Sequence, residues 1–430
     1  MAIVKNRRWQ EQVLLMWAGL FLLTGGLILF LLHRSDGPQI FLGGALAWVG
    51  FLALSVIFSL TGMRFNQCLL PVTAMLCFCS LVFLYRLQPA YAFRQLVWLF
   101  AGLAALLVTV AMRRYYRQMA DYMYVIALLG TVFLLLPIFF GIEQGGNKSW
   151  LDFRYFQVQP SEFVKILLVV FLAAFLSENR LAEARGRERW ITRVGMADLR
   201  DLAPLLAMWA VSLLLLIFQK DLGTALIYYV TFLSMVYVAT SRILYVLSGI
   251  LLFLAGGVVS YYLFGHVQQR VEIWLLDLDG LANISDALYQ KAYQVLQGLY
   301  AMAAGGVTGV GLGAGQPGYI PFVHTDFIFA AIVEEMGLAG GLGILTLYLC
   351  YIYTGLTIAL KARDSYSSLL AAGLTALMGW QCLIIIGGVS KVLPLTGVTL
   401  PFMSYGGSSL VANFIITGLL LNISHEAVEG

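Results

Sequence analysis

YMYVIALLGTVFLLLPIFFG, residues 122–141, is an apolar run without a charged side chain. A helix of about 20 residues is long enough to cross the hydrocarbon core of a membrane, which is about 30 Å thick. Runs of this kind recur along most of the 430-residue chain. The chain is 61% hydrophobic and 11% charged, whereas soluble domains have about 45–50% and about 25%. The sequence therefore predicts an all-α polytopic membrane protein and excludes a soluble one.

About twelve runs qualify as membrane spans. They cover residues 13–33, 40–60, 68–85, 95–112, 122–141, 162–178, 203–219, 222–240, 243–264, 338–360, 367–388 and 407–424. The first run is too long for the apolar region of a cleaved signal peptide, so we expect it to remain as an anchor.

The basic residues predict the orientation. A cytoplasmic N-terminus places most of the 26 lysines and arginines in cytoplasmic loops, as the positive-inside rule requires. An even number of spans returns the C-terminus to the cytoplasm. The loop 142–160, a large loop at 265–337 and the segment 389–406 then face the extracytoplasmic side.

Charged residues in or beside the spans are candidates for a polar site. Glu162 and Lys165 share one face of the sixth span, where a charged side chain costs at least about 2.5 kcal/mol. This pair either faces a polar cavity or forms an ion pair that only orients the helix. Asp221 lies in FQKDLGTA between two spans. It is either a site residue or part of a turn that is exposed to solvent.

The loop 265–337 combines acids, aromatics and glycines. It contains an amphipathic stretch, 289–304, which we expect to lie on the bilayer surface or on the helix bundle. Its glycines between 305 and 315 lack the lysine and serine of a phosphate-binding loop, so they predict tight turns and not a nucleotide site. The small net charge of +4 makes nucleic acid an unexpected partner.

Motifs distributed over most of the chain resemble the FtsW, RodA and SpoVE family of elongation, division and sporulation proteins. They are NKSWLDFRYFQVQPSEFVKI (147–166), QKDLGTA (219–225), RVEIWLLD (270–277), AYQVLQGLYAMAAGGVTGVGLGAGQ (292–316), IPFVHTDFIFAAIVEEMG (320–337) and LPLTGVTLPFMSYGGSS (393–409). The family core has ten spans. The resemblance therefore implies two extra N-terminal helices, within residues 1–141, before a catalytic core at 142–430.

The resemblance implies a peptidoglycan glycosyltransferase in the cytoplasmic membrane of a bacterium. Such an enzyme polymerises lipid II into glycan strands at the outer face, by an inverting displacement, beside a class B penicillin-binding protein that acts as transpeptidase. The motifs are shared by elongation, division and sporulation members and do not select among these roles. A lipid II flippase and a non-catalytic scaffold for a transpeptidase are the alternatives.

The catalytic loop departs from the family pattern because WLDP is absent. Counting forward from Arg270 favours Asp277 or Asp279 as the general base, and counting back from Tyr293 favours Asp286, so all three remain open. A divalent cation, Mg or Mn, is a candidate cofactor beside these aspartates, with no metal ligand assigned. The expected substrate-binding residues are Lys148, Trp150, Arg154, Glu162, Lys165, Asp221, Arg270, Asp326, Ser404, Tyr405 and Ser408, of which Lys148, Arg154, Lys165 and Arg270 are expected to bind the pyrophosphate.

Overall fold

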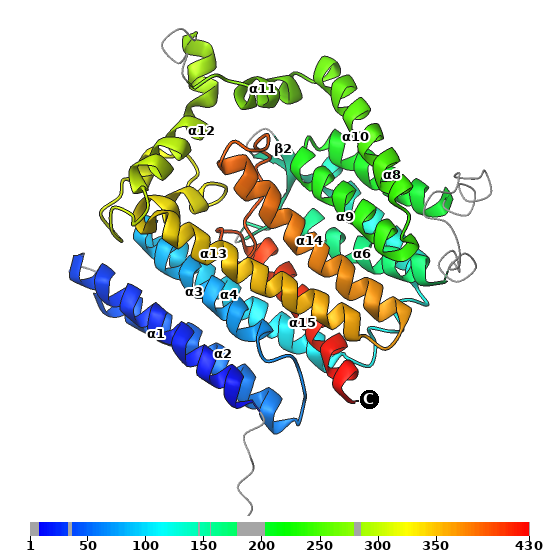
Figure 1. The fold of residues 1–430 in the computed structure, drawn as a ribbon, viewed down its shortest axis with the longest axis horizontal. Coiled ribbons are helices and arrows are strands. Elements are labelled where there is room, and N and C mark those ends of the chain that lie inside the picture. Colours follow the sequence, from blue (N-terminus) through cyan, green and yellow to red (C-terminus); the bar gives the residue numbers. More distant parts are fainter. Residues whose placement is uncertain are drawn as a thin grey trace, which may run out of the picture.

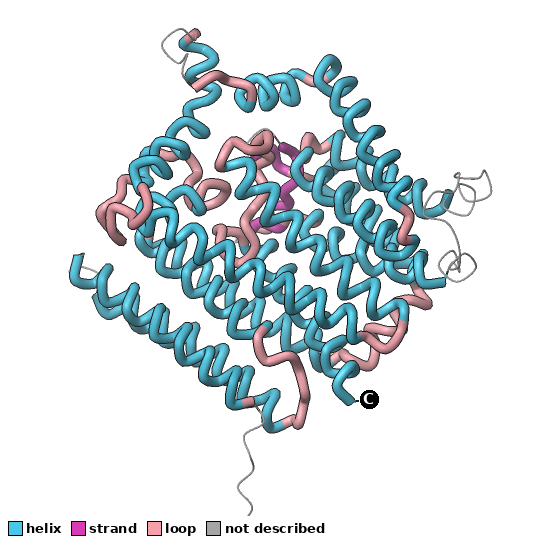
Figure 2. The backbone as a smooth tube through the Cα atoms, in the orientation of Figure 1, coloured by secondary structure: helices cyan, strands magenta, loops and turns pink. Residues whose placement is uncertain are grey.

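The computed structural model describes residues 8–32, 37–144, 147–154, 156–178, 203–278 and 285–429. It is a bundle of helices with a small antiparallel sheet, of strand order β1-β2-β3, near one end (Figures 1 and 2). The elements are α1 (Trp9–Leu32), α2 (Gly37–Leu60), α3 (Leu69–Leu87), α4 (Pro89–Ala111), α5 (Met123–Phe140), β1 (Ile142–Gln144), β2 (Asn147–Asp152), β3 (Gln157–Val158), α6 (Ser161–Glu178), α8 (Ala203–Phe218), α9 (Leu222–Thr240), α10 (Ile243–Leu263), α11 (Gly265–Trp274), α12 (Asp286–Gly305), the 3-10 helix η3 (Pro317–Tyr319), α13 (Ile328–Lys361), α14 (Ser365–Val389) and α15 (Gly407–Glu429).

Each predicted span coincides with a helix. Among the described residues, ten helices are long and apolar enough to cross a membrane. The other two of the predicted set are α6, which contains Glu162 and Lys165, and α8, which is 16 residues long. The chain is therefore an all-α, multi-pass membrane protein, as predicted.

Helix packing separates a buried centre from a lipid-facing periphery. The centre includes α3, α6, α14 and α15, which are apolar around most of their circumference, as expected of helices surrounded by other helices. In contrast, α10 has no buried residue. Gly102 of α4 allows a close approach to α15, because a Cβ atom there would lie 2.1 Å from the Phe414 ring. The predicted division of the chain at residue 141 stays a prediction.

The predicted loop 265–337 contains more helix than the amphipathic stretch that the sequence predicts. It contains α11, α12 and the first turns of α13, which begins at Ile328. Gly337, with a φ of 69°, is not helical and interrupts α13, so the second part of α13 begins where the predicted span at 338 begins. The expected amphipathic helix at 289–304 is confirmed within α12. Glu334 and Glu335 lie in the first turns of α13. Their side chains are buried and accept hydrogen bonds from the backbone of Gln316 and Gly313 in the glycine-rich segment.

Both ends of the described chain lie at the same end of the bundle. Arg8, directly before α1, donates to the Met63 carbonyl, and the backbone N–H of Arg64 donates to Nδ1 of His425 on α15. The sheet, α11 and α12 lie at the opposite end (Figure 1).

Candidate active site

A polar cavity of about 460 Å³ lies at the end of the bundle that carries the sheet. Its walls come from β2, the first turn of α6, the start of α9, α11, α12, the turn before α13 and the segment between α14 and α15. These segments are far apart in the sequence. The cavity therefore exists only when the whole bundle is assembled.

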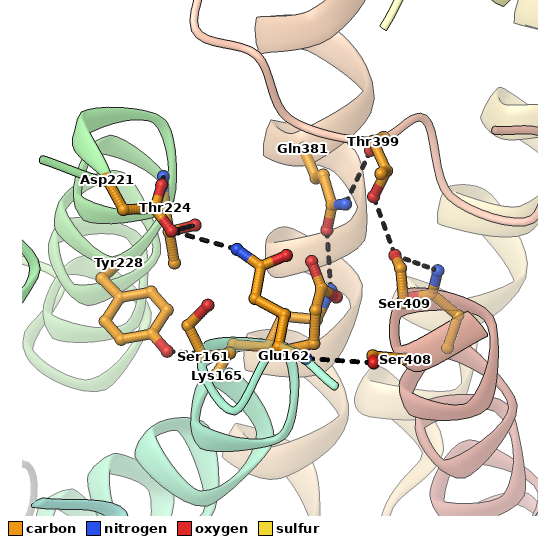
Figure 3. Close-up of polar contacts among 12 residues, drawn as sticks. Ser161, Glu162, Lys165, Asp221, Thr224, Tyr228, Gln381, Thr399, Ser408 and Ser409 are labelled. Carbon is orange, nitrogen blue, oxygen red and sulfur yellow. Dashed lines mark hydrogen bonds and ion pairs between the residues drawn. The ribbon is translucent and has the colours of Figure 1, made fainter. Parts of the chain in front are cut away.

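The floor of the cavity is built on α6. Glu162 lines the cavity, and Lys165, one turn further along, donates to Glu162 with its Nζ 2.5 Å from Oε2 and to Gln381 at 3.0 Å (Figure 3). Gln381 in turn donates to the Thr399 carbonyl. Both charged side chains are buried, so each compensates the other. The prediction that this pair faces a polar cavity is confirmed for Glu162, whereas Lys165 lies behind it.

Asp221 forms a second part of the floor. It is the N-cap of α9, where Oδ1 accepts from the Thr224 backbone at 3.1 Å and Oδ2 accepts from the Thr224 hydroxyl at 2.9 Å. Gln159 also donates to Oδ2 (Figure 3). Asp221 is buried and lines the cavity, so the alternative of a solvated turn is wrong. Burial raises the pKa of this carboxyl, and the Thr224 hydrogen bonds oppose that rise.

Arg270 and Asp326 supply opposite charges to the cavity wall. Arg270, on α11, donates from Nη1 to the Thr396 carbonyl at 3.2 Å. Its burial lowers the pKa of the guanidinium, while Asp221 and Asp326 raise it. Burial raises the pKa of Asp326 to about 6, against the opposing effects of Thr325 and Arg270. The two aspartates and Arg270 therefore act on one another electrostatically.

Two further lysines line the cavity that the sequence did not predict as site residues, Lys291 on α12 and Lys391 after α14. Lys391 has a φ of 60° and donates from Nζ to the carbonyl of Leu276. The sequence indicated these lysines only through their positions, because both lie in segments that are expected on the extracytoplasmic side. Together with Arg270 they give the cavity several cations beside its carboxylates.

Of the remaining predicted site residues, the aromatic ones line the cavity and the serines support its wall. Trp150 and Tyr405 line the cavity. Ser404 donates to the Thr325 carbonyl and accepts from the Leu400 backbone, so it fixes the wall without lining it. Ser408 similarly accepts from the backbone N–H of Gln159 at 3.1 Å (Figure 3).

Lys148 and Arg154 do not line this cavity. Lys148 is exposed and donates to the Ile138 carbonyl at 2.8 Å. Arg154 is exposed, has a φ of 69° and donates its backbone N–H to Asp152. Their expected role in binding pyrophosphate stays a prediction.

The predicted bases that the structure describes, Asp277 and Asp286, do not line the cavity. Asp277 is exposed and directly follows Leu276, the residue bound by Lys391. Asp286 is exposed at the start of α12, five residues before the cavity residue Lys291. Asp279 lies outside the described residues. Within the described part of the chain, the aspartates that line the cavity are Asp221 and Asp326.

The carboxylates of the cavity do not form a recognisable metal site. In the described ranges, no group of three or more His, Cys, Asp or Glu side chains is arranged to hold a metal ion. The predicted divalent cation thus has no ligand set among these residues.

Comparison with known proteins gives one consistent group of relatives. A family model described as "Cell cycle protein", covering FtsW, RodA and SpoVE, matches residues 63–429. The peptidoglycan glycosyltransferase RodA of Mycobacterium tuberculosis is 41% identical over 376 residues, covering 84% of this chain and 78% of the relative. The stage V sporulation protein E of Bacillus subtilis is 34% identical over 345 residues, covering 79% and 89%.

Two solved structures share the fold. One, described as "Structural coordination of polymerization and crosslinking by a peptidoglycan synthase complex", has a TM-score of 0.69 and 26% identity, covering 85% of this chain and 99% of that one. The other is the rod shape determining protein RodA of Thermus thermophilus, with a TM-score of 0.59 and 25% identity, covering 84% and 97%.

Proposed function

The chain belongs to the FtsW, RodA and SpoVE family and is a peptidoglycan glycosyltransferase, and we propose that it polymerises lipid II in the polar cavity. The observation that carries this proposal is the cavity itself, in which cations and carboxylates from distant segments meet at one end of a membrane-embedded bundle. A lipid-linked sugar needs such an arrangement, because its prenyl chain stays in the bilayer while its pyrophosphate and sugars require polar partners.

The cations would stabilise the leaving group. As the glycosidic bond to the pyrophosphate breaks, negative charge builds up on the departing phosphate oxygen. Fixed positive charges aimed at that oxygen contribute most where water is scarce. Arg270, Lys291 and Lys391 line the cavity and suit this role. Lys165, which is bound to Glu162 and Gln381, would act by holding Glu162 in place.

A carboxylate would serve as general base. It takes the proton from the acceptor 4-hydroxyl while that oxygen attacks the anomeric carbon opposite the pyrophosphate, which inverts the configuration. We retain Asp277, Asp279 and Asp286 for this role. The hydrogen bond from Lys391 to Leu276 supports it, because it ties the residue before Asp277 to a cavity side chain. Asp326 would orient Arg270.

The cavity would face the extracytoplasmic side, with both chain ends in the cytoplasm. Basic residues gather at the end opposite the cavity, which supports this orientation. Arg113 contacts His425, and Arg117 forms an ion pair with Glu426 on α15. Cytoplasmic ends of membrane proteins are enriched in such residues.

A class B penicillin-binding protein is the proposed partner. One structural neighbour is described as coordinating polymerization and crosslinking in a peptidoglycan synthase complex. The cavity provides polymerisation chemistry, so crosslinking would come from that second protein.

The test is glycan polymerisation from lipid II by the purified protein together with its transpeptidase partner. Wild type is compared with Asp277→Ala, Asp279→Ala, Asp286→Ala and Asp326→Ala. Asp121→Ala is the matched control, because Asp121 is an exposed aspartate between α4 and α5, away from the cavity. We expect one of the first three variants to abolish polymer while it remains folded, and Asp326→Ala to slow the reaction.

Polymer formation by all of the first three variants at the wild-type rate would overturn the assignment of the base. Loss of polymer in Asp326→Ala alone would transfer that role to Asp326. Absence of polymer from the wild type, with lipid II translocation lost on mutation of Glu162, would favour a flippase.

A further inference from the structure

A second cavity, of about 420 Å³, lies beside the first. It is formed by the turn between α3 and α4, the end of the glycine-rich segment and residues 317–324. Phe322 lines both cavities, and the residues that follow it divide between them: His324 lines the second cavity, and Thr325 and Asp326 line the first. The two spaces are therefore neighbours on either side of one short segment.

Phe322 has features that its contribution to stability does not explain. Its side chain is 66% exposed, so burial of the ring gains little free energy. Its φ of 53° lies in the left-handed region, which is unfavourable for a bulky residue. Strain of this kind persists only where surrounding contacts impose it, and it is concentrated at functional sites.

Specific hydrogen bonds impose this conformation. The Phe322 carbonyl accepts from the backbone N–H of Thr325 at 3.0 Å and from its hydroxyl at 2.9 Å. Gln294 of α12 donates to the adjacent carbonyl of Pro321 at 2.9 Å. The segment is thus fixed from both sides and holds an aromatic ring between the two cavities.

Further aromatic rings connect the cavities. Tyr91 and His324 stack with ring centroids 4.1 Å apart and an interplanar angle of 16°. Tyr405, which lines the first cavity, lies with its centroid 5.0 Å from Tyr91. Flat aromatic faces suit the C–H faces of sugar rings, because the electron-rich π face attracts the partial positive charge of C–H groups.

The charge of the second cavity differs from that of the first. Among its described lining residues, the permanently charged one is Arg86. The Arg86 guanidinium is already engaged, since Nε lies 3.0 Å from Oε1 of Glu335 and Nη2 donates to the carbonyls of Gly313 and Gly315. Burial lowers the pKa of His324, which favours its neutral form. The second cavity is therefore a poor site for pyrophosphate and suits neutral sugars.

We propose that the second cavity is a saccharide subsite, in which Phe322 supports phosphate-free sugars of the glycan strand while the reacting end occupies the first cavity. This inference rests on the proposed polymerase function. Gln88 and Gln316, which are exposed in the second cavity, would bind sugar hydroxyl and acetamido groups. A site of this kind keeps the strand bound between successive additions. It therefore affects the length of the strand more than it affects the rate of a single coupling.

The primary test is direct binding. A soluble, phosphate-free tetrasaccharide cut from peptidoglycan glycan is titrated against the full-length protein in nanodiscs, for wild type, Phe322→Ala, Phe322→Trp and Tyr319→Ala. Tyr319 is the matched control, because it is exposed in the same segment and lines neither cavity. We expect Phe322→Ala to weaken binding about tenfold, and Phe322→Trp and Tyr319→Ala to stay within about threefold of wild type.

Phe322→Gly tests the subsite even if the alanine variant misfolds. Glycine adopts a positive φ without strain, so this variant should unfold at or above the wild-type temperature and still lose tetrasaccharide affinity. In polymerisation assays, Phe322→Ala and Phe322→Gly should make shorter strands than wild type.

Binding that is absent in wild type, unchanged in Phe322→Ala and Phe322→Gly, or equally weakened by Tyr319→Ala would overturn the subsite. If wild type binds the tetrasaccharide through Phe322 but makes no polymer, the proposed function fails and the subsite stands. If wild type polymerises and binding is insensitive to Phe322, the subsite fails and the function stands.

Discussion

Arg86 of α3 forms an ion pair with Glu335 of α13, and the same guanidinium holds the carbonyls of Gly313 and Gly315. The Glu335 side chain is fully buried, so removing its partner leaves a charge in an apolar environment. The pair joins two helices and the glycine-rich segment that borders the second cavity.

We expect Arg86→Ala to destabilise the fold by about 3 kcal/mol, because an unpaired buried charge is costly. Thermal unfolding in detergent measures the loss, and Arg94→Ala, at an exposed arginine of α4, should leave the midpoint unchanged. The double variant Arg86→Met with Glu335→Leu should recover part of the stability, since it removes both charges but leaves backbone groups of Gly313 and Gly315 without these partners. Similar midpoints for Arg86→Ala and Arg94→Ala would contradict this account.

The pair Glu162 and Lys165 allows a structural role to be separated from a functional one. Lys165→Met leaves Glu162 buried without its partner and should lower stability by about 3 kcal/mol. Combining it with Glu162→Gln should restore the unfolding temperature but not polymerisation, because Glu162 lines the cavity. Recovery of polymerisation in the double variant would show that the pair only orients α6.

The cations of the cavity should matter more than those outside it. Arg270→Ala should lower kcat/KM for lipid II about a hundredfold, because a fixed charge is removed from the proposed site of the leaving group. Arg154→Ala is the matched comparison, because Arg154 is exposed and does not line the cavity. Steady-state kinetics at fixed ionic strength measures both. A larger loss in Arg154→Ala would place the pyrophosphate near the sheet instead.

The raised pKa of Asp326 predicts that activity and stability change in opposite directions with pH. Its pKa is about 6 in the fold, above the ordinary value of 3.8, so burial favours the protonated form. Its contribution to stability is thus fully present below pH about 4 and is lost as the pH rises through about 6. The charge that orients Arg270 appears over the same range, so polymerisation should rise with pH. The rate of polymerisation measured as a function of pH tests this rise. In Asp326→Asn, the rate should no longer rise with pH over this range.

The sequence was sufficient to predict the spans because membrane insertion depends on the length and apolarity of each segment separately. The helical turns before Gly337 were not predicted, because Glu334 and Glu335 resemble loop residues until their partners, Arg86 and the glycine-rich segment, are known. The site was predicted in part for the same reason. Motif residues such as Asp221 and Arg270 were found, whereas Lys291 and Lys391 have local surroundings that do not distinguish them from solvated lysines.

The contact between Gly102 of α4 and Phe414 of α15 has a consequence for biosynthesis. Helices enter the membrane in the order in which the ribosome makes them, so α4 is in place long before its partner. The α4 surface around Gly102 is therefore covered only by lipid or by an insertion factor until α15 has been made. The helices before α15 complete their packing only after α15 enters the membrane, and chains that stop before α15 would present this surface to membrane quality-control proteases.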